Sequence, residues 1–278
     1  MAGCLHPHGM DTELTLIGFG EAGATFAAAA RWGRRVRAFD VDPKRRDAMS
    51  QTLVEPSCEP REALGGVRLV LSLVTADAAL QAARSCAPML EREALWIDMN
   101  SVAPDTKREA AATVEQHGAR YIDAAILAPV HPARLKVPIL LAGDCAENAR
   151  AALESIGFAN VRIVGAEVGR ASAIKLIRSV MVKGVEALTH EMMAAAEAAG
   201  VVDDVLASLD ASERSESWRT RAAYNLERMA THGGRRAAEM EEAARTLRAL
   251  GVEPVMTDGT VRRQREAAVP LAAKRSAT

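Results

Sequence analysis

Three glycines near the start of the chain are spaced to hold a phosphate group. Gly18, Gly20 and Gly23 form the pattern G-x-G-x-x-G, directly after the apolar run LTLI and before an alanine-rich helical stretch. In that setting the first glycine permits a tight turn, the second lets a pyrophosphate approach the backbone, and the third lets helix and strand pack closely. The free N–H groups of the helix start favour the anion. We interpret the segment as a dinucleotide site, rather than a purely structural turn, made by Gly18, Phe19, Gly20, Glu21, Ala22 and Gly23.

An acidic residue lies where the ribose of such a dinucleotide is expected. Asp40 ends the second apolar run, 17 residues after Gly23. A carboxylate there accepts hydrogen bonds from both ribose hydroxyls and repels a 2′-phosphate, so the sequence favours NAD over NADP. Arg45 and Arg46 follow shortly after. We interpret them as a solvated helix start, with binding of a 2′-phosphate as the alternative.

A lysine within a long apolar helix is the candidate proton donor. The stretch Arg170–Ala199 has one internal glycine and no proline, which predicts a helix of about 30 residues. Lys175 lies between Ile174 and Leu176, and partial burial lowers the pKa of a lysine toward the range useful for proton transfer. The alternative is a lysine whose stem covers the core while its ammonium reaches water. Ser179, four residues on, faces the same side.

The alternation of apolar runs with amphipathic stretches predicts the fold that positions these residues. Strands are expected at 14–18, 35–40, 67–74, 95–100, 120–126, 137–143 and 161–165. Helices are expected between most of them, at 21–32, 43–51, 76–87, 104–116 and 147–155. This alternation predicts an α/β fold with a Rossmann-type, doubly wound, mostly parallel sheet.

The second half of the chain is predicted to form an all-helical domain. Helices are expected at about 203–210, 214–231, 235–250 and 258–268, with glycines between them. We therefore divide the chain into a disordered extension (1–12), an NAD-binding domain (13–166) and a helical substrate and dimerisation domain (167–278). His232 and Arg236 share one face of a helix only if Gly233 and Gly234 do not break it.

Composition excludes several classes of protein. The net charge of −1 gives no reason to expect nucleic acid or an anionic membrane as partner. The four cysteines form no CxxC pair and no His-rich cluster accompanies them, so neither a metal site nor a disulfide framework is expected. The N-terminus lacks the features of a signal peptide, and no apolar run reaches the length of a membrane span. We expect a cytoplasmic protein.

Several segments together resemble the β-hydroxyacid dehydrogenase family, the relatives of 6-phosphogluconate dehydrogenase. The resemblance covers nearly the whole chain, and the order and spacing of its elements carry it. The final segment looks most like a subgroup with an uncharacterised C-terminal domain of phosphogluconate-dehydrogenase type. The matching segments are GFGEAG (18–23), SLVTADAAL (72–80), DMNSVAPDT (98–106), DAAILAPVHPARLKVPILLAGD (123–144), GRASAIKLIRS (169–179) and HGGRRAAEMEEAARTLRALGVEP (232–254).

This resemblance implies an NAD-dependent dehydrogenase in which Lys175 is the general acid/base and no metal is needed. It implies a small-molecule substrate, a polar alcohol such as a hydroxy acid, and a homodimer with interleaved helical domains. An imine reductase and a dinucleotide-binding regulatory protein without turnover are the alternatives. Val74 and Thr75 correspond to the segment near the nicotinamide ribose, and the residues corresponding to the substrate site are Ser101, Leu127, Ala128, Ser179, His232 and Arg236.

One departure from the family pattern bears on the substrate. Where the family has D-A-P-V-S-G-G, this chain has Asp123 to Pro129, so Leu127 replaces a serine and Pro129 replaces a glycine. A side-chain donor and a main-chain donor are both lost. A buried carboxylate without partners is costly. We therefore expect three- and four-carbon 3-hydroxy acids to be poor substrates and bulkier compounds to be better ones.

Overall fold

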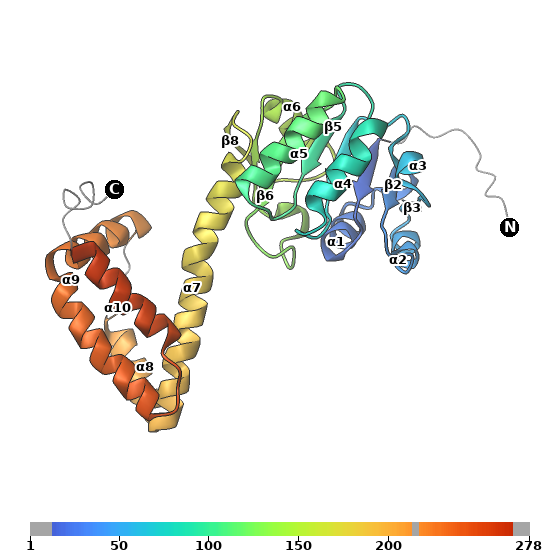
Figure 1. Ribbon diagram of the computed structural model, residues 1–278. Coiled ribbons are helices and arrows are strands. Elements are labelled where there is room, and N and C mark those ends of the chain that lie inside the picture. The colour runs from blue at the N-terminus through green and yellow to red at the C-terminus, as the bar shows by residue number, and fades with distance from the viewer. Residues whose placement is uncertain (1–12, 213–216, 269–278) are drawn as a thin grey trace. The chain divides into compact units, whose positions relative to one another are not determined.

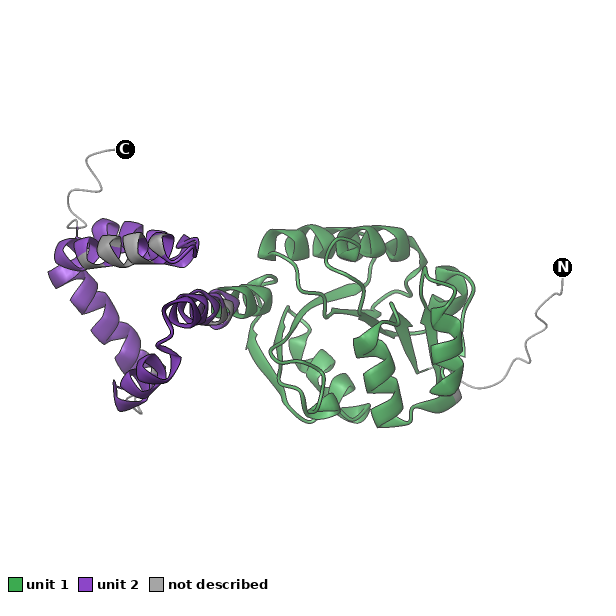
Figure 2. Ribbon diagram, turned by 90° about the horizontal axis from the view of Figure 1, so that it is seen from below, with its two compact units in different colours: residues 1–178 green, residues 179–278 purple. Residues whose placement is uncertain are grey.

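The computed structural model describes residues 13–212 and 217–268, in two compact units that divide between Arg178 and Ser179 (Figure 2). The predicted extension, residues 1–12, lies outside the described residues. The first unit is built on one eight-stranded sheet in the order β3-β2-β1-β4-β5-β6-β7-β8 (Figure 1). Its strands are β1 (Leu14–Ile17), β2 (Val36–Phe39), β3 (Glu55–Pro56), β4 (Leu69–Ser72), β5 (Leu95–Asp98), β6 (Arg120–Ile126), β7 (Ile139–Ala142) and β8 (Val161–Gly165).

Helices cover both faces of this sheet, as a doubly wound fold requires. One face packs against α1 (Glu21–Ala30), α2 (Arg45–Gln51) and α6 (Ala146–Ser155), and the other against α3 (Pro60–Leu64), α4 (Ala79–Cys86) and α5 (Pro104–Gln116). Short 3₁₀ turns complete the connections: η1 (Gly33–Arg35), η2 (Ala87–Met89) and η3 (Arg134–Lys136). The predicted Rossmann-type fold is confirmed.

The sheet departs from uniform parallel pairing at one place. β6 and β7 run antiparallel, whereas the other neighbouring strands are parallel. The connection between them holds only η3, so no crossover helix returns the chain to the starting edge of the sheet. The two-residue strand β3 and the five-residue helix α3 were not predicted, because elements this short leave no clear periodicity.

The second unit is helical. The 30-residue helix α7 (Arg170–Ala199) begins in the first unit, and α8 (Val202–Ser212), α9 (Trp218–Ala249) and α10 (Val255–Ala268) follow it. The prediction of two helices separated at residues 232–234 is wrong, because α9 continues through Gly233 and Gly234. A Cβ at Gly233 would lie 2.3 Å from the carbonyl oxygen of Gln264, so this glycine allows α9 and α10 to pack closely.

Candidate functional site

Each of the three glycines in the loop after β1 is favoured at its position by a different feature of the geometry. Gly18 has a φ of +92°, and a Cβ there would lie 2.6 Å from the carbonyl oxygen of Leu73. A Cβ on Gly23 would lie 3.1 Å from the oxygen of Gly18, so this glycine permits the close packing of helix on strand. A Cβ on Gly20 would meet no protein atom within 4 Å. The second glycine therefore borders open space at the start of α1, where a ligand's phosphate can reach the backbone.

The start of α1 has the groups that an anion needs. Helix geometry leaves the first-turn N–H groups of residues 21–23 without intrahelical acceptors. Asp40, which follows β2, accepts a hydrogen bond from the N–H of Phe19 on Oδ2 (2.7 Å) and from the N–H of Asp42 on Oδ1 (2.8 Å). Each carboxylate oxygen can accept a second bond, so the ribose hydroxyls can still be bound. The loop, helix start and carboxylate fit a dinucleotide.

A cavity of about 370 Å³ adjoins this loop. It is lined by residues of the glycine-loop helix α1, of the segment after β4, and of the loops after β5 and β6, and by Lys175. Most of its lining residues are apolar. The lining residues are Glu21, Ala22, Leu73, Val74, Ala76, Met99, Asn100, Ser101, Ile126, Ala128, Pro129, Val130 and Lys175.

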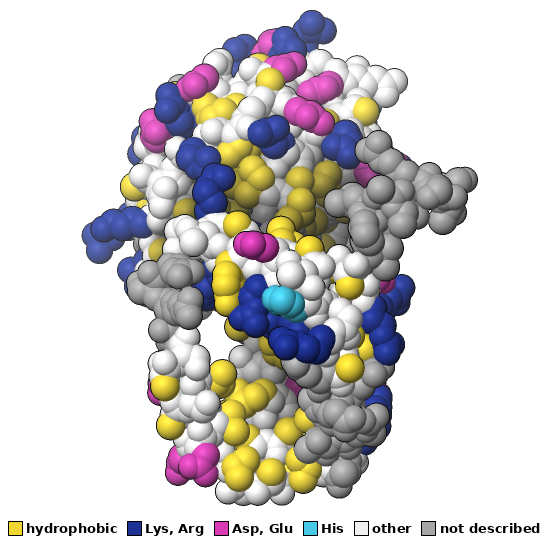
Figure 3. Space-filling model, turned by 90° about the vertical axis from the view of Figure 1, so that its left-hand side faces the viewer, with side chains coloured by type: hydrophobic (Ala, Val, Ile, Leu, Met, Phe, Trp, Pro, Cys, Tyr) yellow, Lys and Arg dark blue, Asp and Glu magenta, His cyan; other side chains and the backbone are white. Residues whose placement is uncertain are grey.

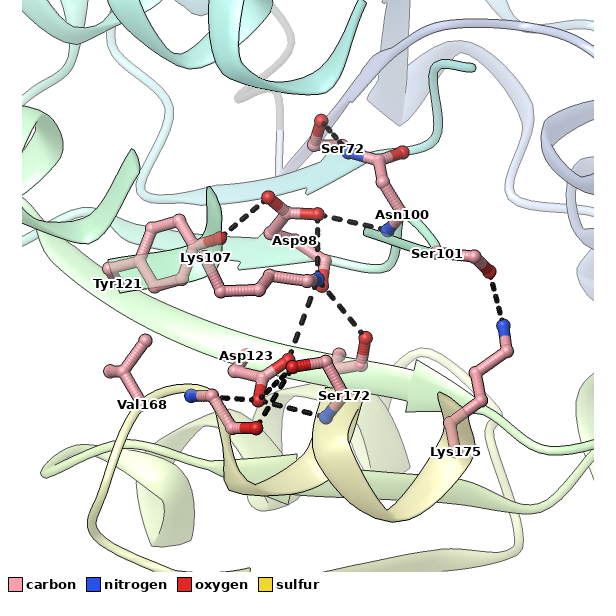
Figure 4. A network of polar contacts seen from close by, with 12 residues as sticks. Ser72, Asp98, Asn100, Ser101, Lys107, Tyr121, Asp123, Val168, Ser172 and Lys175 are labelled. Atoms are coloured by element: carbon pink, nitrogen blue, oxygen red, sulfur yellow. Dashed lines mark hydrogen bonds and ion pairs between the residues drawn. The ribbon is translucent and has the colours of Figure 1, made fainter. Parts of the chain in front are cut away.

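The two polar residues predicted on this wall contact each other. The Nζ of Lys175 donates a hydrogen bond to the Oγ of Ser101 (Figure 4). Lys175 is half-buried on α7, whereas its neighbours Ile177 and Val180 are exposed. Asn100, which is 5% exposed, donates a hydrogen bond from Nδ2 to the Oγ of Ser72 (2.9 Å). Lys175 is thus held at the cavity beside a hydroxyl.

Behind the cavity lies a buried ionic cluster that the sequence did not single out. Lys107 of α5 donates from Nζ to Oδ1 of Asp98 (2.9 Å) and lies 3.5 Å from Oδ1 of Asp123. The hydroxyl of Tyr121 donates to Oδ2 of Asp98 (2.6 Å). Burial is the main cause, and the negative charge of Asp98 the second, that raises the pKa of Tyr121 well above its usual value. The phenol therefore stays a donor.

The remaining predicted residues lie in different surroundings. Thr75 is exposed, and the Leu127 side chain packs against the small apolar cluster around Ala125 rather than appearing among the residues that line the cavity. Ser179 follows Lys175 by one turn of α7 but belongs to the second unit.

The two predicted residues of α9 share a continuous helix. His232 is exposed and Arg236 is half-buried, and their spacing places them on one face. Their roles in substrate binding, like that of Ser179, remain predictions.

Comparison with known proteins identifies the family. Residues 13–165 match the NAD-binding domain of 6-phosphogluconate dehydrogenase. The chain belongs to this family. Residues 196–267 match a domain of unknown function (DUF1932). The resemblance inferred from the sequence motifs is thereby confirmed, as is the presence of an NAD-binding domain.

Relatives with similar sequences include one dehydrogenase and one uncharacterized protein. The chain is 25% identical over 221 residues to 3-hydroxyisobutyrate dehydrogenase of Pseudomonas aeruginosa, covering 74% of this chain and 72% of that protein. It is 27% identical over 145 residues to an uncharacterized 28.5 kDa protein of Methanothermus fervidus, covering 52% of this chain and only 54% of that protein.

Solved structures with a similar fold include two conserved proteins and an imine reductase. A conserved hypothetical protein from Sinorhizobium meliloti 1021 is 38% identical, with a TM-score of 0.62 over 93% of this chain and 89% of that one. A conserved protein described as structurally similar to 3-hydroxyacid dehydrogenases is 31% identical, with a TM-score of 0.61 over 92% and 96% of the two chains. An imine reductase from Myxococcus stipitatus in complex with NADP⁺ shares the fold, with a TM-score of 0.76 at 22% identity over 92% and 93%.

Within residues 13–212 and 217–268, no three or more His, Cys, Asp or Glu side chains are grouped to hold a metal ion. The cysteines described there, Cys58, Cys86 and Cys145, are free thiols, and burial raises the pKa of Cys86 to about 12. Over the same residues, no helix is both long and apolar enough to cross a membrane.

Proposed function

We propose that the protein is an NAD-dependent oxidoreductase that interconverts a hydroxy acid, or a related polar alcohol, and its carbonyl form. The supporting observation is a single cavity lined both by the first turn of the glycine-loop helix and by Lys175. A nicotinamide cofactor supplies or accepts the hydride when it is bound there. The chain itself has to bind the substrate and move one proton at the substrate oxygen.

Lys175 is the group we assign to that proton. As the carbonyl is reduced, its oxygen gains negative charge, and the ammonium of Lys175 stabilises this charge and donates the proton. In the direction of oxidation, the neutral amine takes the hydroxyl proton. Ser101 holds the Nζ of Lys175 by a hydrogen bond and offers a second polar atom to the substrate.

The cavity wall supports a proposal for the class of substrate. Apart from Asn100, Ser101, Lys175 and Glu21, its lining residues are apolar. Pro129, on this wall, has no N–H to offer a carboxylate. We therefore propose a substrate with a bulky apolar group, and expect a kcat/KM for 3-hydroxyisobutyrate, serine and glycerate well below that for aryl-substituted hydroxy compounds.

Reduction of a C=N bond is the second candidate, because the same apolar wall suits a cyclic imine as well as a hydrophobic ketone. A panel of hydroxy acids, ketones, aldehydes and imines, followed by NADH absorbance, separates the two. Turnover of alcohols and carbonyls supports the proposal, turnover of imines alone replaces it, and NADH binding without any turnover indicates a regulatory role. Lys175→Ala, run in parallel, reports background reduction.

We also propose that the protein acts as a homodimer. Apolar side chains on α7 are open to solvent: Ile177 is 72% exposed and Val180 is 76% exposed. Figure 3 shows further hydrophobic side chains at the surface of one face, among Lys and Arg side chains. A second copy of the chain, packed against α7, would bury the exposed side chains of Ile177 and Val180. Light scattering after size exclusion should give twice the chain mass, and Val180→Asp should give the single-chain mass.

A further inference from the structure

Lys107 occupies a place where a lysine is rarely found. Its side chain is fully buried, as is that of Asp123, and Asp98 is 1% exposed. Its ammonium donates to Oδ1 of Asp98 and to the carbonyl oxygens of Asp98 (2.6 Å) and Ala124 (3.4 Å), and it forms an ion pair with Asp123. Burying such ions costs free energy, and apolar residues of similar volume are often at least as stable. Stability alone therefore gives no reason for a lysine here.

The first carboxylate of the cluster supports the loop that carries Ser101. Asp98 ends β5, and its Oδ1 accepts a hydrogen bond from the N–H of Asn100 (2.9 Å) as well as from Lys107. This bond closes a turn of the backbone immediately before Ser101. The position of the Ser101 hydroxyl at the cavity thus depends on Asp98.

The second carboxylate supports the helix that carries Lys175. Asp123 of β6 accepts on Oδ2 the N–H groups of Gly169 (3.0 Å) and Ser172 (3.1 Å), together with the hydroxyl of Ser172 (3.3 Å). These groups lie immediately before α7 and in its first turn, so the carboxylate caps that helix and interacts favourably with its dipole. Lys175 lies three residues after Ser172, one turn along the helix.

We propose that Lys107 is a positioning residue for the pair formed by Lys175 and Ser101. One ammonium binds both carboxylates, and each carboxylate fixes one member of the pair (Figure 4). Lys107 is enclosed and does not line the cavity, so it acts through the backbone of the loop and the start of α7. The inference rests on the proposed function only in treating Lys175 as the proton donor.

The test removes the ammonium together with one of its two carboxylates, so the net charge of the cluster does not change. Asp98 keeps its hydrogen bonds from the N–H of Asn100 and the hydroxyl of Tyr121. In Lys107→Met/Asp123→Asn, one cation and one anion disappear together, and the amide oxygen at residue 123 can still accept the N–H groups of α7. The rate at which an amine-reactive reagent labels Lys175 is measured by peptide mass spectrometry. We expect a rise of at least threefold, toward the rate in Ser101→Ala, while labelling of the exposed Lys136 stays constant.

A matched control breaks an ion pair of the same helix outside the cluster. Arg84→Gln removes the exposed pair with Glu109 of α5 and should leave the labelling of Lys175 unchanged. With a substrate in hand, the double variant should lose at least tenfold in kcat and show a shifted pH profile of kcat, while its Kd for NADH changes less than twofold.

Unchanged labelling of Lys175 in a folded double variant overturns the inference. If the double variant does not fold, Lys107→Gln alone is measured, and an unaltered rate there overturns the inference equally. Labelling needs no turnover. A protein that reduces nothing but shows the expected labelling would therefore refute the proposed function and leave the positioning role intact.

Discussion

Gly20→Ala is expected to weaken cofactor binding without weakening the fold. A Cβ at residue 20 meets no protein atom within 4 Å, and its φ of −77° suits alanine. The methyl group instead occupies the space through which a pyrophosphate would approach the start of α1. We expect the Kd for NADH to rise at least tenfold, which corresponds to about 1.4 kcal/mol.

Gly18→Ala is the matched comparison, and it should have the opposite profile. A φ of +92° costs an alanine roughly 1–2 kcal/mol. Its Cβ would lie 2.6 Å from a backbone oxygen of Leu73. Relieving that contact requires the loop or β4 to move, at about 1–3 kcal/mol. The free energy of unfolding should therefore fall by about 2–5 kcal/mol in total.

Urea denaturation and fluorescence titration with NADH measure the two quantities separately. The reasoning is refuted if Gly20→Ala binds NADH within twofold of the natural protein. It is equally refuted if Gly20→Ala unfolds as easily as Gly18→Ala, because the space beside Gly20 would then be filled by protein and not by a ligand.

Three further predictions concern the cofactor and the helical unit. NAD should bind at least tenfold more tightly than NADP, since a 2′-phosphate would face Asp40, and titrations with equal or reversed affinities would contradict this. Gly233→Ala should destabilise the protein by about 1–3 kcal/mol, because its Cβ would lie 2.3 Å from the carbonyl oxygen of Gln264. Gly234→Ala, whose Cβ meets nothing within 4 Å, should stabilise the protein by up to about 1 kcal/mol. Denaturation that gives both changes the same sign would refute the packing argument. Burial alone would raise the pKa of Glu191, but hydrogen bonds from the start of α10 lower it below its usual value. The unfolded chain therefore binds the proton more tightly, so stability should be lost as the pH falls below about 4.5, and the loss should be smaller in Glu191→Gln. Identical acid denaturation curves for the two proteins would argue against this.

The first half of the fold could be predicted because its signals are local. Apolar runs bounded by turns mark the strands, and the predicted helix at 104–116 coincides with α5. The antiparallel pairing of β6 and β7 could not be foreseen, since strand direction depends on how the connecting segment packs. The same holds for Gly233, whose role is set by the approach of α10 and not by helix propensity.

The polar side chains on the cavity wall could be predicted in part. Ser101 and Lys175 were expected there from family motifs, and the structure shows them hydrogen-bonded to each other. Lys107 was missed, although a signal for it existed. It shares the buried face of α5 with Ala110, Ala111 and Val114, and a lysine at such a position calls for buried partners.

In the sequence, the partners of Lys107 were visible only as the aspartates of two similar tripeptides, WID and YID. β5 ends in WID and β6 contains YID, and the structure pairs Asp98 with Asp123 in register. Only the register shows that the two carboxylates lie side by side, and register depends on the assembled sheet.

The central claim is that Lys175 delivers the proton at a cavity shared with the dinucleotide. The most direct measurement is single-turnover reduction of the best substrate from the panel by Lys175→Ala preloaded with NADH, compared with the natural protein. The account predicts a rate at least about 100-fold lower, with the Kd for NADH changed less than twofold. A folded variant that reduces the substrate at a near-natural rate would contradict it.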